Sequence, residues 1–120
     1  MTIKMFEYSR CGTCRKATKW LTANDIDYTA IPIVDKPPTK SALTKMWKRS
    51  GLPIRKFFNT SGGSYREGGF KDRLATMSDK EAIECLAADG MLIKRPLLDT
   101  GDKVLVGFRE ADWSDALLSD

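Results

Sequence analysis

The sequence of 120 residues contains no histidine. This absence excludes Ser-His-Asp and Cys-His catalysis, metal sites with histidine ligands and acid-base chemistry by histidine. Cysteine is scarce as well, with only Cys11, Cys14 and Cys85. An odd number of cysteines cannot pair completely into a disulfide framework, and reducing cytosol keeps thiols free. We therefore expect any disulfide in this chain to be transient.

Long apolar runs are also missing. The uninterrupted apolar stretches extend over only a few residues, and the first four residues, Met1–Lys4, lack the apolar core of a secretory signal. We therefore expect no membrane association and a cytoplasmic location.

The composition is typical of a folded protein, with 42% hydrophobic and 30% charged residues. A chain of 120 residues suits one core, so we expect a single domain over residues 1–120 and one functional site. Twenty Lys and Arg against sixteen Asp and Glu give a net charge of +4 at pH 7. This excess favours anionic ligands or an acidic protein face and is too small to indicate direct nucleic-acid binding.

The first part of the chain predicts a β-α-β unit. Residues 3–8 predict a short buried strand that runs directly into the Cys11-Gly12-Thr13-Cys14 motif. Apolar residues at helical spacing then predict a helix that ends near Asn24. Residues 28–34 predict a second strand, and the prolines after it open a helix over about 40–50. Cys11 is thus expected at the N-terminus of a helix.

The second part predicts short helical pieces and then a hairpin. Residues 51–77 are irregular and rich in glycine pairs, whereas a capping box begins a helix that spans 78–90. Residues 91–98 and 104–108 predict the two strands of a hairpin, and a last helix follows over 110–118.

The order strand, helix, strand, helices, hairpin, helix is that of an α/β protein with a thioredoxin-like fold. We expect a mixed sheet of about four strands, in which the two early strands are parallel and the two late strands antiparallel. The helices at about residues 39–89 would form an insert between the two halves.

The CxxC motif predicts thiol-disulfide chemistry. A cysteine at a helix N-terminus beside cations has a lowered pKa, because the helix dipole and the charges favour the thiolate, and Arg10 and Arg15 flank Cys11. Cys14 is one turn further along, where it can resolve an adduct formed at Cys11. Half of a zinc site is one alternative, but only Cys85 remains as a ligand. Inert buried thiols are another alternative, and Cys85 itself is expected to be a core or half-buried thiol.

Three passages together resemble the ArsC/Spx family of arsenate reductase-like proteins. They are Cys11-Gly12-Thr13-Cys14-Arg15-Lys16-Ala17, Phe57-Phe58-Asn59-Thr60-Ser61-Gly62 and Ile93-Lys94-Arg95-Pro96-Leu97. The resemblance extends over essentially the whole chain. It implies a thioredoxin fold with a helical insert, and it covers both reductases and transcription regulators that bind RNA polymerase.

The resemblance to the reductases implies roles for individual residues. Cys11 matches the nucleophile, Arg95 the middle one of three arginines that hold the oxyanion, and Pro96 the cis proline that faces the cysteine pair. Asn59 stands at the position of the first arginine, and Arg109 comes one residue after the position of the third arginine. The remaining expected substrate-binding residues belong to the helix start and are Gly12, Thr13 and Arg15.

The function expected from these observations is that of an arsenate reductase-like thiol-disulfide oxidoreductase acting on a small oxidised substrate or oxyanion. No bound cofactor and no metal are expected, and the reductant would be glutathione with glutaredoxin, or thioredoxin. The alternative is an Spx-type redox-sensing regulator. Such a protein would contact the C-terminal domain of the RNA polymerase α-subunit through the basic insert, where Gly51 matches a contact glycine. A structural module with incidental cysteines is a third interpretation.

Overall fold

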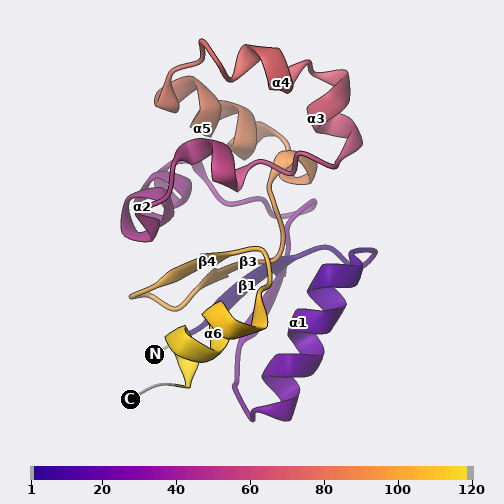
Figure 1. Ribbon diagram of the computed structural model, residues 1–120, viewed down its shortest axis with the longest axis vertical. Coiled ribbons are helices and arrows are strands. Elements are labelled where there is room, and N and C mark those ends of the chain that lie inside the picture. The colour runs from indigo at the N-terminus through magenta and orange to yellow at the C-terminus, as the bar shows by residue number, and fades with distance from the viewer. Residues whose placement is uncertain (1, 119–120) are drawn as a thin grey trace.

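A computed structural model describes residues 2–118, and it contains one mixed sheet with strand order β2-β1-β3-β4 (Figure 1). The strands are β1 (Lys4–Glu7), β2 (Thr29–Pro32), β3 (Leu97–Asp99) and β4 (Val104–Val106). β1 is parallel to β2, whereas β3 is antiparallel to both β1 and β4. The predicted four-stranded, thioredoxin-like sheet is confirmed.

Helical segments lie on both sides of this sheet. The α-helices are α1 (Gly12–Ala23), α2 (Lys40–Ser50), α3 (Gly63–Glu67), α4 (Phe70–Arg73), α5 (Asp79–Ala88) and α6 (Glu110–Leu117), and the 3-10 helices are η1 (Ile54–Phe57) and η2 (Gly90–Leu92). The segments between β2 and β3, which we call the insert, stand above the sheet in Figure 1, and α1 and α6 lie below it. Within residues 2–118, no helix combines the length and the apolarity needed to cross a membrane.

Side-chain caps begin two of the predicted helices, and the capping box predicted at Ser78 is one of them. The side chain of Thr39 accepts a hydrogen bond from the backbone N–H of Ala42 over 3.1 Å, which caps α2. Ser78 accepts one from the N–H of Glu81 over 3.2 Å, which caps α5. Each contact satisfies an N–H that a helix start would otherwise leave without a partner.

The prediction of a strand over residues 91–98 is wrong in its first part, because β3 begins only at Leu97. Asp89 accepts a hydrogen bond from the N–H of Met91 over 3.0 Å and thereby starts η2 instead. The chain after η2 pairs with the insert and not with the sheet: Lys94 N–H donates to the carbonyl of Phe57 over 2.8 Å. The apolar side chains of this stretch therefore fill the core of the insert.

The pleat of the strands divides the core into two clusters. Met5 and Leu98 face α1 and α6, whereas Phe6 and Leu97 face the insert. All four side chains are buried, at 8% exposure or less. The cluster on the α1 side also contains Ala17, Leu21 and Trp113, and the cluster on the insert side also contains Leu43, Met46, Phe57, Phe58 and Leu86.

An ion pair joins the insert to the sheet. Arg49 at the end of α2 donates to both carboxylate oxygens of Asp99 in β3, over 2.7 and 3.1 Å. Burial would raise the pKa of Asp99, but the Arg49 guanidinium and the N–H of Gly101 hold it below its usual value. A carboxylate with a lowered pKa stabilises the fold above its unfolded pKa, and this contribution is lost as the pH falls through the folded pKa.

We therefore expect Arg49→Met to lower the free energy of unfolding by about 1 kcal/mol near neutral pH. The difference from the unmodified protein should disappear in acid, once Asp99 is protonated. Urea unfolding at neutral pH and in acid measures the free energy of unfolding of both proteins and therefore the difference between them at each pH. Lys45→Met, an exposed cation on the same helix, is the matched control and should change stability by less than about 0.5 kcal/mol at either pH. A deficit of Arg49→Met that persists unchanged in acid would contradict this account.

Candidate active site

Cys11 is the N-cap residue of α1. The chain leaves β1 and turns back at Tyr8, whose carbonyl accepts a hydrogen bond from the N–H of Cys11 over 3.0 Å. Cys11 has extended backbone angles, and its sulfur accepts a hydrogen bond from the N–H of Cys14 over 3.4 Å. The expectation that Cys11 stands at a helix N-terminus is confirmed. Its sulfur thus lies where the unpaired amides and the helix dipole favour negative charge.

Cys14 occupies the first turn of α1 with its side chain turned inward. It is 1% exposed and follows the same helix face as the buried Ala17 and Leu21, whereas Cys11 is partly accessible. Burial, assisted by the nearby Cys11 sulfur, raises the pKa of Cys14 to about 12. The two free thiols are therefore unequal, and only Cys11 is placed to meet a substrate first.

Arg95 supplies the positive charge beside Cys11. Burial would raise the pKa of Cys11, but the hydrogen bond from Cys14 and the nearby positive charge of Arg95 bring it below the ordinary value for a thiol. The sequence prediction named Arg10 and Arg15 as the nearby cations. Both are exposed, and neither belongs to the groups that lower this pKa.

Two contacts hold the guanidinium of Arg95 in place. It lies over the ring of Tyr8, 5.1 Å from the ring centroid, and its Nη1 donates to the carbonyl of Met91 over 3.2 Å. The Nε atom is buried and has no hydrogen-bond partner among residues 2–118. A buried donor without a fixed partner remains available to an anionic group. From the sequence, Tyr8 was expected only as a residue of the first strand, and its contact with Arg95 was not predicted. The position of an aromatic residue just before the CxxC motif could have indicated such a contact.

Pro96 is buried, and the Arg95–Pro96 peptide bond is cis, as the resemblance implies. The carbonyl of Pro96 accepts a hydrogen bond from the N–H of Gly107 over 2.8 Å, just after β4. Gly107 in turn accepts one from the indole N–H of Trp113 in α6 over 3.0 Å. The position of Arg95 is thus tied to the sheet and to the last helix.

Asn59 is half-buried on a segment that pairs with the chain leading to Arg95. Its N–H donates to the carbonyl of Leu92 over 2.8 Å, and its carbonyl accepts from the N–H of Gly62 over 3.2 Å. The side-chain amide lies close to Gly62, because a Cβ there would stand only 2.7 Å from Nδ2. The structure therefore brings Asn59 to the strand-like pair that carries Arg95.

The other residues predicted to bind substrate have different surroundings. Gly12, Thr13 and Arg15 are exposed in the first turn of α1, beside Cys11. Arg109 has an 85% exposed side chain that forms an ion pair with Asp112 over 3.8 Å, and it does not contribute to the pKa of Cys11. The structure thus groups the helix start with the cysteines and leaves Arg109 in solvent.

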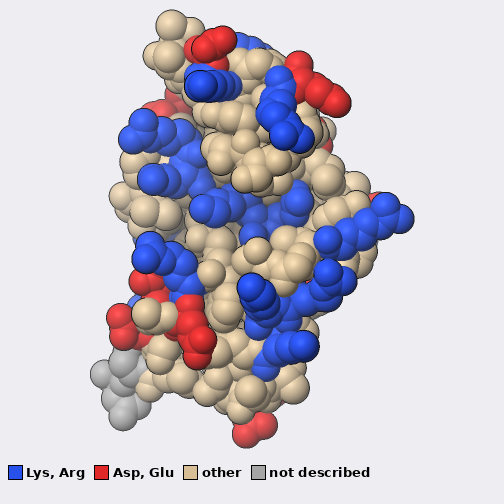
Figure 2. Space-filling view, turned by 45° about the vertical axis from the view of Figure 1, so that its right-hand side comes forward, with Lys and Arg blue, Asp and Glu red and all other residues tan. Residues whose placement is uncertain are grey.

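One face of the molecule is rich in basic side chains. Figure 2 shows Lys and Arg side chains spread across the middle of one face of the molecule, with Asp and Glu mostly nearer its upper and lower parts. Helix α1 contributes Arg15, Lys16 and Lys19 to the surface and carries no acidic residue. Such a surface favours the approach of anionic substrates or acidic proteins.

The alternative of a zinc site requires further ligands close to the cysteine pair. In the part of the chain that the structure describes, no three His, Cys, Asp or Glu side chains gather as they would around a metal ion. Cys85 lies on α5, partly buried against the core of the insert, as predicted.

The mixed sheet, the cysteine at the start of the first helix and the cis proline define a thioredoxin-like fold with a CxxC site. The chain belongs to the ArsC family, whose model matches residues 6–116. YusI from Bacillus subtilis is 48% identical over 115 residues, which are 96% of this chain and 98% of YusI. A crystal structure of an ArsC family related protein from Bacteroides fragilis superimposes with a TM-score of 0.93 at 46% identity, covering 96% of this chain and 97% of that one.

Relatives at lower identity include two functional types. An arsenate reductase from Rhizobium meliloti is 26% identical over 82% of this chain and 69% of its own length. Global transcriptional regulators named Spx also match this chain. Family membership is therefore compatible with either activity.

We expect Arg95→Gln to raise the pKa of Cys11, because the substitution removes the cation that favours the thiolate. The rate of Cys11 alkylation by iodoacetamide, followed against pH by peptide mapping, measures this shift. Lys94→Gln is the matched control, since Lys94 is the exposed neighbouring cation. Cys14, with its pKa raised to about 12, should stay unlabelled throughout the neutral range. An unchanged midpoint in Arg95→Gln would refute the assignment of Arg95.

Proposed function

We propose that this protein is an ArsC-like thiol-disulfide oxidoreductase in which Cys11 is the nucleophile and Cys14 the resolving thiol. The observation that carries the proposal is the pairing of a partly accessible cysteine, whose pKa is lowered at a helix N-terminus, with a buried second thiol one turn behind it. These are the properties of an attacking and a resolving thiol.

In the first step the thiolate of Cys11 attacks the oxidised atom of the substrate. For an oxyanion such as arsenate, a sulfur-arsenic bond forms, and an arsenic-oxygen bond breaks so that a hydroxyl group, which takes up a proton from solvent, leaves as water. Arg95 lies beside the sulfur, and its buried Nε is free to donate to an oxyanion oxygen. The amides at the start of α1, in Gly12 and Thr13, offer further donors.

In the second step Cys14 loses its proton and attacks the sulfur of Cys11. The bond between this sulfur and the substrate breaks, its electron pair stays with the substrate atom, and a Cys11–Cys14 disulfide forms. The charge of Cys11 contributes to the raised pKa of Cys14, and bonding the Cys11 sulfur to the substrate removes the thiolate charge from that atom. Formation of the adduct thus makes the resolving thiol easier to deprotonate.

In the last step a cellular thiol system returns two electrons and two protons to the disulfide. Glutathione with glutaredoxin and thioredoxin are the two candidate donors, and no bound cofactor is required. The basic surface around α1 favours an anionic thiol or an acidic protein as the donor.

The chain's own residues bear on the choice of substrate. Asn59 offers a neutral amide where the reductases have an arginine, and Arg109 is solvent-exposed, so Arg95 is the principal cation near the nucleophile. A site with one cation suits an oxidised substrate that carries less negative charge than the substrate of a site with three arginines. Arsenate is the first substrate to test, and a sulfur-based oxidised substrate is the second.

The test is arsenate-dependent NADPH consumption, coupled separately through glutathione with glutaredoxin and through thioredoxin with thioredoxin reductase. Cys11→Ser should lower kcat/KM by at least about 1000-fold, because no other thiol can replace the nucleophile. Cys14→Ser should retain turnover only where an external thiol such as glutathione can resolve the adduct. Cys85→Ser is the matched control and should turn over normally.

Turnover that survives Cys11→Ser would refute the proposal. If arsenate gives no turnover in either system, the same variants should be assayed with a low-molecular-weight disulfide. Absence of turnover there as well would favour the second candidate function.

The second candidate is a redox-sensing regulator of the Spx type. Gly51 ends α2 in the left-handed conformation, with φ 69°, and a Cβ there would meet nothing within 4 Å. This exposed glycine lies three residues after the exposed Lys48, which suits a basic contact surface. Two results together would favour this function: absent turnover, and binding to the C-terminal domain of the RNA polymerase α-subunit with an affinity that changes when the cysteine pair is oxidised.

A further inference from the structure

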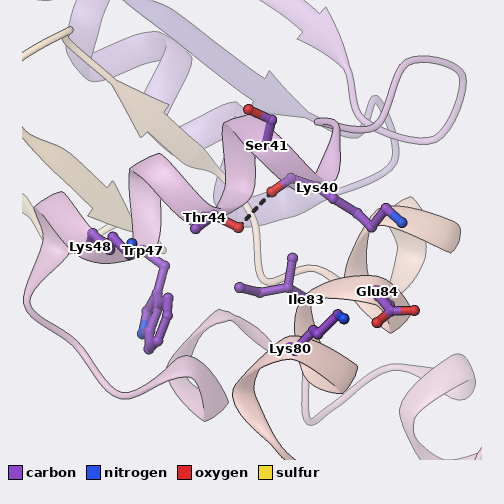
Figure 3. Close-up of a pocket in the computed structure, with 8 residues that line it drawn as sticks. All are labelled: Lys40, Ser41, Thr44, Trp47, Lys48, Lys80, Ile83 and Glu84. Atoms are coloured by element: carbon purple, nitrogen blue, oxygen red, sulfur yellow. Dashed lines mark hydrogen bonds between the residues drawn. The ribbon is translucent and has the colours of Figure 1, made fainter.

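A groove of about 430 Å³ runs between α2 and α5, on the helical insert (Figure 3). Its two walls are helix faces: Lys40, Thr44 and Trp47 follow the spacing of one face of α2, and Lys80 and Ile83 that of one face of α5. None of the residues assigned above to thiol chemistry lines this groove. It is therefore a second concave site, separate from Cys11.

The inner surface of the groove is apolar. In Figure 3 Trp47 and Ile83 point from opposite helices into the same space. The indole N–H of Trp47 already donates to the carbonyl of Leu52 over 2.9 Å, and the hydroxyl of Thr44 donates to the carbonyl of Lys40 over 2.8 Å. Because the polar atoms of both side chains are engaged, they present ring and methyl carbons to a ligand.

The rim of the groove is positively charged. Lys40, Lys48 and Lys80 line it together with one acidic residue, Glu84. Among residues 2–118 the side-chain ion pairs within 4.0 Å join Arg49 to Asp99 and Arg109 to Asp112, and none of the three rim lysines takes part. Three lysines against one glutamate therefore leave a positive rim around an apolar interior.

We propose that this groove binds a small amphipathic anion, a carboxylate or sulfonate with a short alkyl or aromatic body. The body would lie between Trp47 and Ile83, and the anionic head would face the rim lysines. The volume is at the lower end of the range for small-molecule sites, about 300 to 1,000 Å³, which suits a body of roughly one ring or one short chain. The charge of the rim selects an anion over a neutral or cationic ligand of the same shape.

The experiment is a titration with octanoate, followed through the indole N–H resonances of the three tryptophans, Trp20, Trp47 and Trp113. We expect the resonance of Trp47 to shift in a saturable manner and those of Trp20 and Trp113, which pack on the other side of the sheet, to stay in place. Acetate supplies the charge without the body, and 1-octanol supplies the body without the charge. Both should bind more weakly than octanoate.

Variants separate the contributions of charge and shape. Lys40→Gln and Lys80→Gln should each weaken octanoate binding about three- to fivefold, the size of one exposed ion pair. Lys45→Gln, on α2 but outside the groove, is the matched control and should bind as tightly as the unmodified protein. Thr44→Arg, which places a long side chain into the groove, should abolish the shift of Trp47.

Three outcomes would overturn the proposal. They are a shift spread equally over the three tryptophans, equal binding of octanoate and 1-octanol, and a loss of affinity in Lys45→Gln as large as that in Lys40→Gln. Circular dichroism of each variant shows whether a loss of binding arises from unfolding. Thiol turnover should be the same with and without octanoate, so this test is independent of the function proposed for Cys11.

Discussion

The amide of Cys14 donates to the sulfur of Cys11 over 3.4 Å, and the chemistry of the site depends on this contact. A sulfur atom caps the first helix here, in the place where a serine or aspartate oxygen usually accepts. The helix thereby directs its positive end at the atom that has to become a thiolate, while the same turn directs Cys14 into the core. One turn of helix thus makes two identical side chains chemically different. The partly accessible thiol of Cys11 has a lowered pKa, and the buried thiol of Cys14 has a raised one.

The remainder of the fold brings a cation to this turn. Arg95 follows the strand-like pair within the insert and precedes the cis proline that leads into the sheet, so both halves of the molecule determine its position. The ring of Tyr8 supports the guanidinium from the end of β1. The insert therefore contributes to the thiol site through its backbone, and it carries a separate groove on the face between α2 and α5.

Much of this architecture could be predicted from local patterns. The apolar spacing of Cys14, Ala17 and Leu21 and the capping box at Ser78 depend on neighbouring residues alone, and the structure confirms them. The strand predicted over 91–98 was wrong in its first part because the partner of that stretch, the segment near Phe57, lies far away in sequence and competes with the sheet for backbone hydrogen bonds. The local pattern pointed to Arg10 and Arg15 as the cations beside Cys11, whereas Arg95, which lowers its pKa, lies far away in sequence and was named only through the family resemblance.

The proposed chemistry requires that Cys11 and Cys14 form a reversible disulfide within one chain. The most direct measurement is peptide mapping by mass spectrometry after oxidation of the reduced protein with one equivalent of diamide. The account predicts a monomer with a Cys11–Cys14 disulfide, a free Cys85 thiol and full recovery of both thiols on reduction. Cys11 found in a disulfide with Cys85 or with a second chain, while Cys14 remains a free thiol, would contradict it.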